Sequence, residues 1–289
     1  MKSRITGYLL LFVVSVAIFL VVLFPGHQLA AYFSQTLTHP QKNIYTNMEN
    51  VHLSLPFSLK SEDARISIGR DFTVQPDFIK IRLGPGLVFG DQRQIHFNSE
   101  LYKGLMKGSF GFEDTQPVAY TNVQLNLSGL EFDKIRYNTR MAQITMTGKI
   151  DGDYRYDADT DTQNDPGQGS ILIKDFSADL TNSLFNRLKL SRIDFSRVDI
   201  RFTQEQNTIN LSELTASGSV INVKLSGIIQ LEEPVVNSRL TLAGTVLPDS
   251  PYLASFANSP AIKALVKNIK KDGIRFAVKG TLRQPEIKI

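Results

Sequence analysis

The sequence has no cysteine and no tryptophan in its 289 residues. The absence of cysteine excludes disulfide bonds, thiolate zinc sites and cysteine nucleophiles. A domain of this composition must be held together without disulfide bonds. Histidine is scarce, and the four present do not have the spacing of metal ligands; they are His27, His39, His52 and His96.

Strong net charge is also missing. The formal net charge is +4, and Lys2 and Arg4 precede the first apolar run, so the remainder is nearly neutral and gives no case for nucleic acid binding. Nucleophile-elbow and phosphate-binding glycine motifs are absent. Asp151 and Asp153 would share one side of a strand, but nothing else marks them as catalytic. We expect no enzyme activity and no cofactor.

A long apolar run opens the chain. An uncharged stretch from Ile5 to Phe24 would span about 30 Å as a helix, the thickness of a bilayer's hydrocarbon core. Lys2 and Arg4 before it predict a cytoplasmic N-terminus, with the rest of the chain across the membrane. The predicted transmembrane anchor includes Ile5, Leu10, Val14, Phe19 and Phe24.

A cleaved signal peptide is the alternative to an anchor. It requires a shorter apolar region and small residues before the cleavage site, and Leu29-Ala30-Ala31 is the nearest candidate. With an anchor, residues 1–24 are the cytoplasmic tip and membrane span. Residues 25–42 are then a juxtamembrane connector in which a few helical turns could continue the anchor, and residues 43–289 form a β domain outside the cytoplasm.

Beyond the connector, apolar and polar residues alternate, as in strands with one apolar face. The alternation over residues 51–59 predicts one strand, at an edge or bulged because Pro56 cannot donate a backbone hydrogen bond. Val123, Leu125 and Leu127 predict another strand, which Ser128-Gly129 would close. We therefore expect a mainly β fold: a long curved antiparallel sheet, with glycines that recur on its apolar face and permit curvature.

Residues 151–169 are acidic and rich in turn formers, which predicts an exposed loop and a possible internal boundary. Asp157, Asp159 and Asp161 resemble the opening of a calcium loop, but Thr162 stands where glycine is required and Gln168 where glutamate is required. A solvated loop is the alternative interpretation, and we predict no metal site.

A short amphipathic helix is predicted near the C-terminus. Ser259-Pro260 is a typical helix start, and Gly273 a typical end. The helix could lie on a membrane surface or a partner, because lysines crowd its polar side, or it could pack over one end of the sheet. Its apolar positions are Ile262, Leu265, Val266 and Ile269.

One apolar row per strand would create an apolar surface that must be covered, closed on itself or filled by a ligand. Such a surface could be a trough for acyl chains, or the same residues could form an ordinary packed core. The residues chosen to test the trough are Leu125, Leu127, Ile144, Met146, Val223 and Leu225.

Four stretches carry a resemblance to known proteins. The ending VKGTLRQPEIKI resembles the closing strand of AsmA-like envelope proteins. Three further stretches resemble motifs of the bacterial type II secretion system protein N family: SELYKGLMKGSF (99–110), GKIDGDYRYD (148–157) and GIIQLEEPVVNSRLTLAGTVLPDSP (227–251). The resemblance spans most of the chain in the right order, although residues 43–94 carry little of it.

The resemblance implies a single-pass protein of the bacterial inner membrane with its bulk in the periplasm. It implies a structural or assembly role in type II protein secretion, with other secretion-system subunits as partners. The alternative that it implies is an AsmA-like lipid-binding or lipid-transfer module, in which an apolar trough of the sheet takes up acyl chains.

Overall fold

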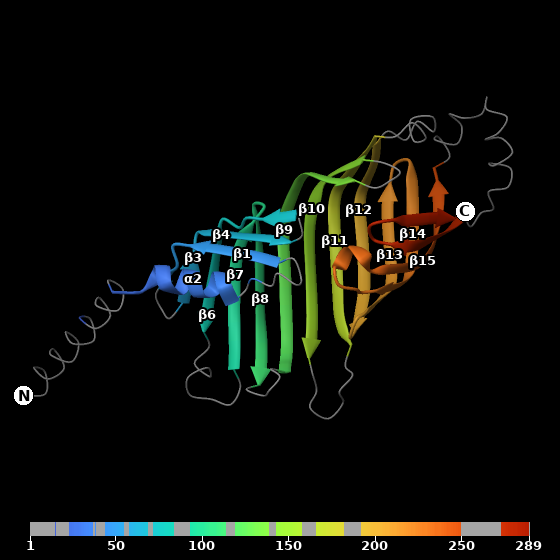
Figure 1. Ribbon diagram of the computed structural model, residues 1–289. Helices are drawn as coiled ribbons and strands as arrows, with labels where there is room; N and C mark the ends of the chain where they lie inside the picture. Colours follow the sequence, from blue (N-terminus) through green and yellow to red (C-terminus); the bar gives the residue numbers. More distant parts are fainter. Residues whose placement is uncertain are drawn as a thin grey trace, which may run out of the picture. The chain divides into compact units, whose positions relative to one another are not determined.

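The computed structural model confirms a mainly β fold, with 77% of the structure in strands and one large antiparallel sheet (Figure 1). Most of the expected N-terminal anchor, and the C-terminal helix around Ile262, fall outside the described residues. Phe24, the last residue of the expected anchor, is described and packs against the apolar cluster that contains Ala30 and Met48. The structure describes residues 15, 23–36, 38, 44–54, 58–68, 72–83, 93–113, 119–138, 143–157, 166–181, 192–249 and 273–288.

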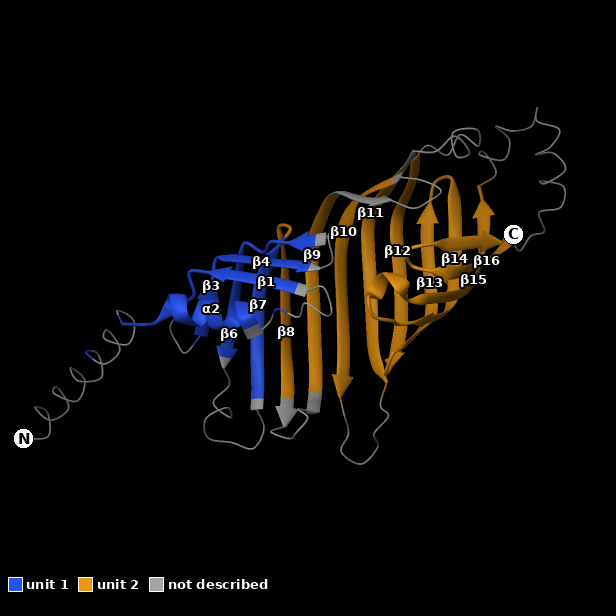
Figure 2. Ribbon diagram, in the orientation of Figure 1, with its two compact units in different colours: residues 1–101 blue, residues 102–289 orange. Residues whose placement is uncertain are grey.

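The chain divides into two compact units, Met1–Leu101 and Tyr102–Ile289 (Figure 2). Each unit has its own packing and is described by itself. Residues 151–169, which the sequence suggested as a possible internal boundary, belong to the second unit.

The first unit contains one described helix and seven strands. Helix α2 spans Gly26–Thr36, within the segment in which helical turns were expected. A three-stranded antiparallel sheet has the order β1-β4-β5. The seven strands of the first unit are β1 (Ile44–Glu49), β2 (His52–Ser54), β3 (Ser58–Ser61), β4 (Asp63–Ile68), β5 (Phe72–Val74), β6 (Phe78–Leu83) and β7 (Arg93–Leu101).

Helix α2 covers the free edge of β1. The hydroxyl of Ser34 accepts a hydrogen bond from the backbone N–H of Met48 at 2.8 Å, and that of Thr38 accepts one from Thr46 at 2.9 Å. An uncovered edge strand offers unpaired backbone groups to other chains, so these hydroxyls satisfy donors that β4 cannot reach. Beneath them, buried Ala30 and Met48 belong to one apolar cluster.

The second unit is built from strands that follow one another in sequence order, each antiparallel to the next. Neighbours in sequence are thus neighbours in the sheet, which short connections favour. The strands are β8 (Gly104–Glu113), β9 (Ala119–Asn138), β10 (Gln143–Asp157), β11 (Gly167–Thr181), β12 (Arg192–Glu205), β13 (Thr208–Gly218), β14 (Ile221–Gln230), β15 (Arg239–Pro248), β16 (Ile274–Thr281) and β17 (Pro285–Lys288).

Bulges keep the apolar residues on one face even where the alternation changes phase. In β12, Ser196 and Arg197 are both exposed between Phe195 and Val198, and the register to β13 shifts there. Each bulge inserts one extra residue, so the apolar positions before and after it still point to the same side. Comparable irregularities occur at Gly129 in β9, Asp175 in β11 and Ser212–Glu213 in β13.

Three sequence-based boundaries were wrong. Residues 51–59 do not form one strand, because β2 pairs with β3 and His52 lies opposite Lys60. Ser128-Gly129 does not close a strand, because Gly129 takes a φ of 64° as a bulge inside β9. Much of the expected loop 151–169 is strand instead, since β10 extends to Asp157 and β11 begins at Gly167. Pro56 lies outside the described residues, and β2, which precedes it in the chain, is the last strand in the order of the large sheet.

At Gly227, in β14, the backbone of the neighbouring strand β15 approaches closely. The φ of Gly227 is 141°, and a Cβ placed there would lie 2.3 Å from the carbonyl oxygen of Thr241. We expect Gly227→Ala to lower the free energy of unfolding by about 1–3 kcal/mol, because both the conformation and the contact disfavour a side chain. Urea unfolding of the full chain, followed by circular dichroism, measures this. Ser226→Ala on the exposed neighbour is the control, and equal midpoints for the two variants would contradict the prediction.

Candidate functional site

The register of the second unit places apolar side chains in continuous rows across the strands. Directly paired residues of antiparallel strands share a face, so a row can be followed from strand to strand. No charged residue stands in this row, and its members from β8 to β17 are Gly108, Leu125, Tyr154, Gly169, Phe202, Leu211, Gly227, Leu242, Val278 and Ile287.

Parallel rows extend this apolar face along the strands. The next row contains Met106, Leu127, Gly152, Ile171, Ile200, Leu214, Leu225, Gly244 and Phe276. The row after it contains Leu130, Ile150, Ile173, Val198, Ala216, Val223, Val246 and Ile274. We call the surface formed by these three rows the apolar face.

The six residues chosen from the sequence lie on this side of the sheet. Leu125 is in the first row, Leu127 and Leu225 are in the second, and Val223 is in the third. Ile144 and Met146 continue the same side along β10, opposite Leu180 and Ala178. All six are half-buried, which is intermediate between a surface and a closed core.

A fully buried core exists at one part of the apolar face. Leu211, Leu240 and Leu242 are 6%, 7% and 9% exposed and form one cluster. Half-buried neighbours on β12–β16, such as Phe202 and Val278, pack against it. The apolar face therefore combines a packed region with regions that retain accessible aliphatic surface.

The opposite face carries the charges. Arg197 binds Asp199 at 2.6 Å, two residues along the same strand, and Arg192 binds Asp194 in the same way at 2.8 Å. The guanidinium of Arg197 lowers the pKa of Asp199, and that of Arg192 lowers the pKa of Asp194. Exposed pairs of this kind contribute little stability, but they keep this face in water.

Asp151 and Asp153 both lie on the charged face, as the sequence indicated. The ammonium group of Lys174 is 2.9 Å from Asp151, and the backbone N–H of Gly129 donates to the same carboxylate at 2.8 Å. Asp153 accepts a hydrogen bond from the hydroxyl of Ser170 at 2.6 Å. These partners give both carboxylates a structural role. Asp151, in β10, links the β9 bulge to β11 through its hydrogen bond to Gly129 and its ion pair with Lys174.

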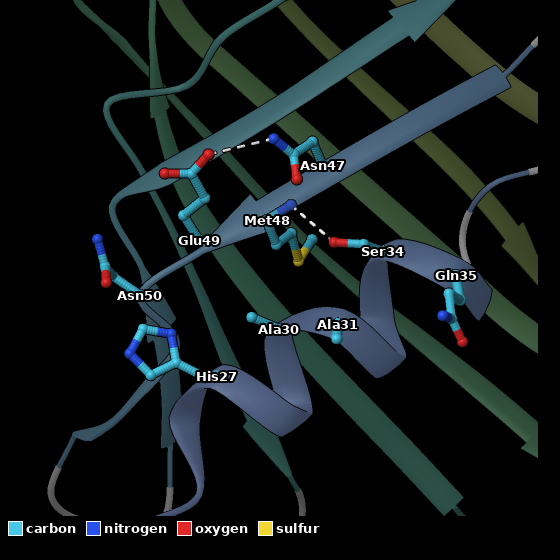
Figure 3. Close-up of a pocket in the computed structure, with 9 residues that line it drawn as sticks. All are labelled: His27, Ala30, Ala31, Ser34, Gln35, Asn47, Met48, Glu49 and Asn50. Atoms are coloured by element: carbon cyan, nitrogen blue, oxygen red, sulfur yellow. Dashed lines mark hydrogen bonds between the residues drawn. The ribbon is translucent and has the colours of Figure 1, made fainter.

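A pocket of about 480 Å³ with a mixed polar and apolar lining lies in the first unit, between α2 and β1 (Figure 3). The hydroxyl of Ser34 and the amide of Asn47 both make hydrogen bonds within the protein, to the Met48 N–H and to Glu49. The pocket is lined by His27, Ala30, Ala31, Ser34, Gln35, Asn47, Met48, Glu49 and Asn50. We assign no ligand to it, because its lining presents neither a cluster of like charges nor an extended apolar wall.

The part of the chain that the structure describes holds no group of three or more acidic or histidine side chains that could bind a metal. Asp157 is paired with Arg155, while Asp159 and Asp161 lie outside the described residues. Lys2, Arg4, Ile5, Leu10, Val14 and Phe19 lie outside them too, as do Ile262, Leu265, Val266 and Ile269. In the described ranges, no helix has the length and apolar character that crossing a bilayer requires.

The six residues chosen from the sequence to test the trough include none of the aromatic side chains on this side of the sheet. Tyr154 stacks on Phe202, with ring centroids 6.3 Å apart, and Phe176 stacks on Phe195 at 6.1 Å. Tyr154 was overlooked because it lies in the segment interpreted as an acidic loop. The alternation of Gly152, Tyr154 and Tyr156 with charged residues was the signal that could have revealed a strand there.

Comparisons with known proteins do not extend this description. No protein-family model, curated protein or solved structure matches the chain.

Asp151 provides a prediction of pH dependence. Lys174 first, and then the Gly129 N–H, lower its pKa below the ordinary value of 3.8. Since the folded-state pKa is the lower one, the stabilisation is fully present above about pH 4 and is lost as the pH falls through the folded-state pKa. We expect Asp151→Asn to lower stability at pH 7 by less than about 1 kcal/mol, because the pair is partly exposed.

Urea midpoints of the full chain between pH 7 and pH 3 measure this effect. The difference between the wild-type chain and Asp151→Asn should shrink as the pH falls. Asp153→Asn is the matched control, since its carboxylate has a hydroxyl partner rather than a cation. A difference that stays constant over this range would contradict the assignment of the Lys174 pair as its source.

Proposed function

We propose that this protein is a membrane-anchored envelope protein whose apolar face binds the hydrocarbon chains of lipids. The observation that supports this most is the separation of side chains in the second unit. Uncharged apolar rows, half-buried at many positions, lie on one face, and ion pairs lie on the other. The bulged, glycine-containing sheet is consistent with the curved, AsmA-like trough expected from the sequence.

Physical chemistry favours a hydrocarbon ligand for such a face. Each square ångström of apolar surface removed from water contributes about 25 cal/mol, so accessible Leu, Ile and Val side chains that follow one another across many strands favour coverage. A peptide partner would bring backbone polar groups that need hydrogen-bond partners. The middle of the apolar face offers none, whereas an acyl chain requires none.

The N-terminal sequence supports a location at a membrane. The apolar run with Lys2 and Arg4 before it predicts a single span with a cytoplasmic N-terminus and the sheet in the periplasm. Helix α2 starts at Gly26, directly after that run, and its hydroxyls bind β1. The first unit would therefore begin at the membrane surface, with a few residues as the connection.

A second candidate function is a structural or assembly role in the type II secretion system. It rests on the resemblance of three sequence stretches to the protein N family, and two of these coincide with the strands β10 and β14–β15. The two functions are compatible, since a lipid-bound sheet could also contact other subunits. Crosslinking in intact cells would attach secretion-system subunits if this role is correct, and the absence of such adducts would count against it.

A charge on the apolar face tests the lipid-binding function. We expect Leu125→Lys to reduce bound lipid about tenfold or more, because an ammonium group next to a hydrocarbon chain costs well over the roughly 1.4 kcal/mol that a tenfold change requires. Native mass spectrometry of the full chain, extracted gently from membranes, measures the lipid that remains bound.

Gln124→Lys is the matched control, because it adds the same charge one residue away on the opposite, exposed face of β9. Leu125→Ser serves as a second variant if the lysine disturbs folding, as judged by circular dichroism. Equal lipid content in all variants, or no lipid on the wild-type chain, would rule the function out.

A further inference from the structure

Hydrogen-bonding side chains on the apolar side of β10–β16 are confined to one end of β10 and β12. Among the described residues of these strands they are Tyr154, Tyr156 and Gln204. Gln204 pairs with Gly167, one row beyond the pair of Phe202 and Gly169. The rest of this side, from Ile171 through Phe195, is apolar or glycine.

Two glycines make room for an aromatic shelf at this end. A Cβ at Gly169 would lie 2.3 Å from the ring of Phe202, and a Cβ at Gly167 would lie 2.3 Å from the hydroxyl of Tyr154. The rings of Tyr154 and Phe202 therefore extend over β11 from both sides and stack with an interplanar angle of 15°. The hydroxyl of Tyr154 therefore lies over Gly167, in the row that also contains Gln204.

The environment of Tyr154 is only partly aqueous. Burial raises the pKa of its phenol above the ordinary value, with a smaller contribution from neighbouring Tyr156. A half-buried phenol gains from a hydrogen-bonding ligand, because such a ligand replaces water that the neighbouring apolar groups restrict. Gln204 adds an amide in the row of Gly167, the glycine next to the Tyr154 hydroxyl, and that amide also donates to the carbonyl of Gln206 at 3.3 Å.

The opposite end of the same strands differs in character. Phe176 lies between Phe132 and Phe195, with ring centroids 6.4 and 6.1 Å away. Phe202 and Phe195 are seven positions apart in β12, or roughly 20 Å along a strand at about 3.3 Å per residue, allowing for the bulge. One leaflet of a bilayer's hydrocarbon core is about 15 Å deep, so a single acyl chain fits between them.

We propose that Tyr154, Tyr156 and Gln204 form the polar rim that holds the head group of a single-chain amphiphile, whose tail lies along β10–β12 toward Phe195. The inference rests on the proposed lipid-binding function and adds the orientation of the ligand. Its occupant matches the face in charge: an uncharged tail lies on uncharged rows, and a hydrogen-bonding head lies at the end where the described residues of β10–β16 carry hydrogen-bonding side chains.

Fluorescence quenching tests the orientation, because the chain has no tryptophan and a single introduced one is a clean reporter. Phe202→Trp places the reporter at the rim and Phe195→Trp places it at the far end. The probes are octadecanoic acids brominated either near the carboxyl group or near the methyl end, added to the full chain held in amphipol. Ile209→Trp, on the strand paired with Gln204, replaces Phe202→Trp if that variant does not fold.

We expect carboxyl-end bromines to quench the rim reporter at least twofold more than the far reporter, and methyl-end bromines to show the reverse. Tyr154→Phe should keep the ring stack and weaken octadecanoic acid binding about fivefold, the effect of losing one hydrogen bond. Tyr102→Phe, on an exposed turn, is the matched control and should leave binding unchanged.

The outcomes separate this inference from the function on which it rests. If brominated chains bind but quench both reporters alike, the chains lie across the strands and the orientation is wrong. If Tyr154→Phe binds as tightly as the wild-type chain, the polar rim is wrong. If no probe binds, or a segment of the chain itself occupies the face, the lipid-binding function fails as well.

Discussion

The second unit depends on one constraint: each strand must present most of its apolar residues to the same side. Side chains alternate with a period of two, so a register slip of one residue would turn a whole row toward water. The bulges in β9, β11, β12 and β13 are the means by which the chain meets this constraint when its alternation changes phase. Asp151 strengthens one of them, because it binds the N–H of the bulge residue Gly129.

The same separation of faces links fold to function. Ion pairs such as Arg197–Asp199 keep one face solvated, while the other collects aliphatic rows that are buried at some positions, such as Leu211 and Val198, and half-buried at others. A packed core needs no ligand, but accessible aliphatic rows favour one. The proposed lipid binding would rest on the same pattern that stabilises the sheet, and the proposed polar rim at Tyr154 would give the ligand a direction.

Much of the strand content could be predicted from alternation alone. The alternation of apolar and polar residues predicted a mainly β fold with a long antiparallel sheet, which the structure confirms. Boundaries failed where a local signal competed with pairing: Gly129 looked like a strand end but is a bulge, and the acidic residues of β10 looked like a loop. In both places long-range pairing with neighbouring strands overrides the local preference.

The sequence by itself determined the alternation, the lack of disulfides and the separation of apolar from charged positions, because these depend only on residue type and spacing. Tertiary structure decided the register, and therefore which residues meet across strands. Tyr154 and Phe202 are distant in sequence, and they stack only because two glycines of β11 lie between them. Such a contact depends on strand order and on the absence of two Cβ atoms, which no local pattern encodes.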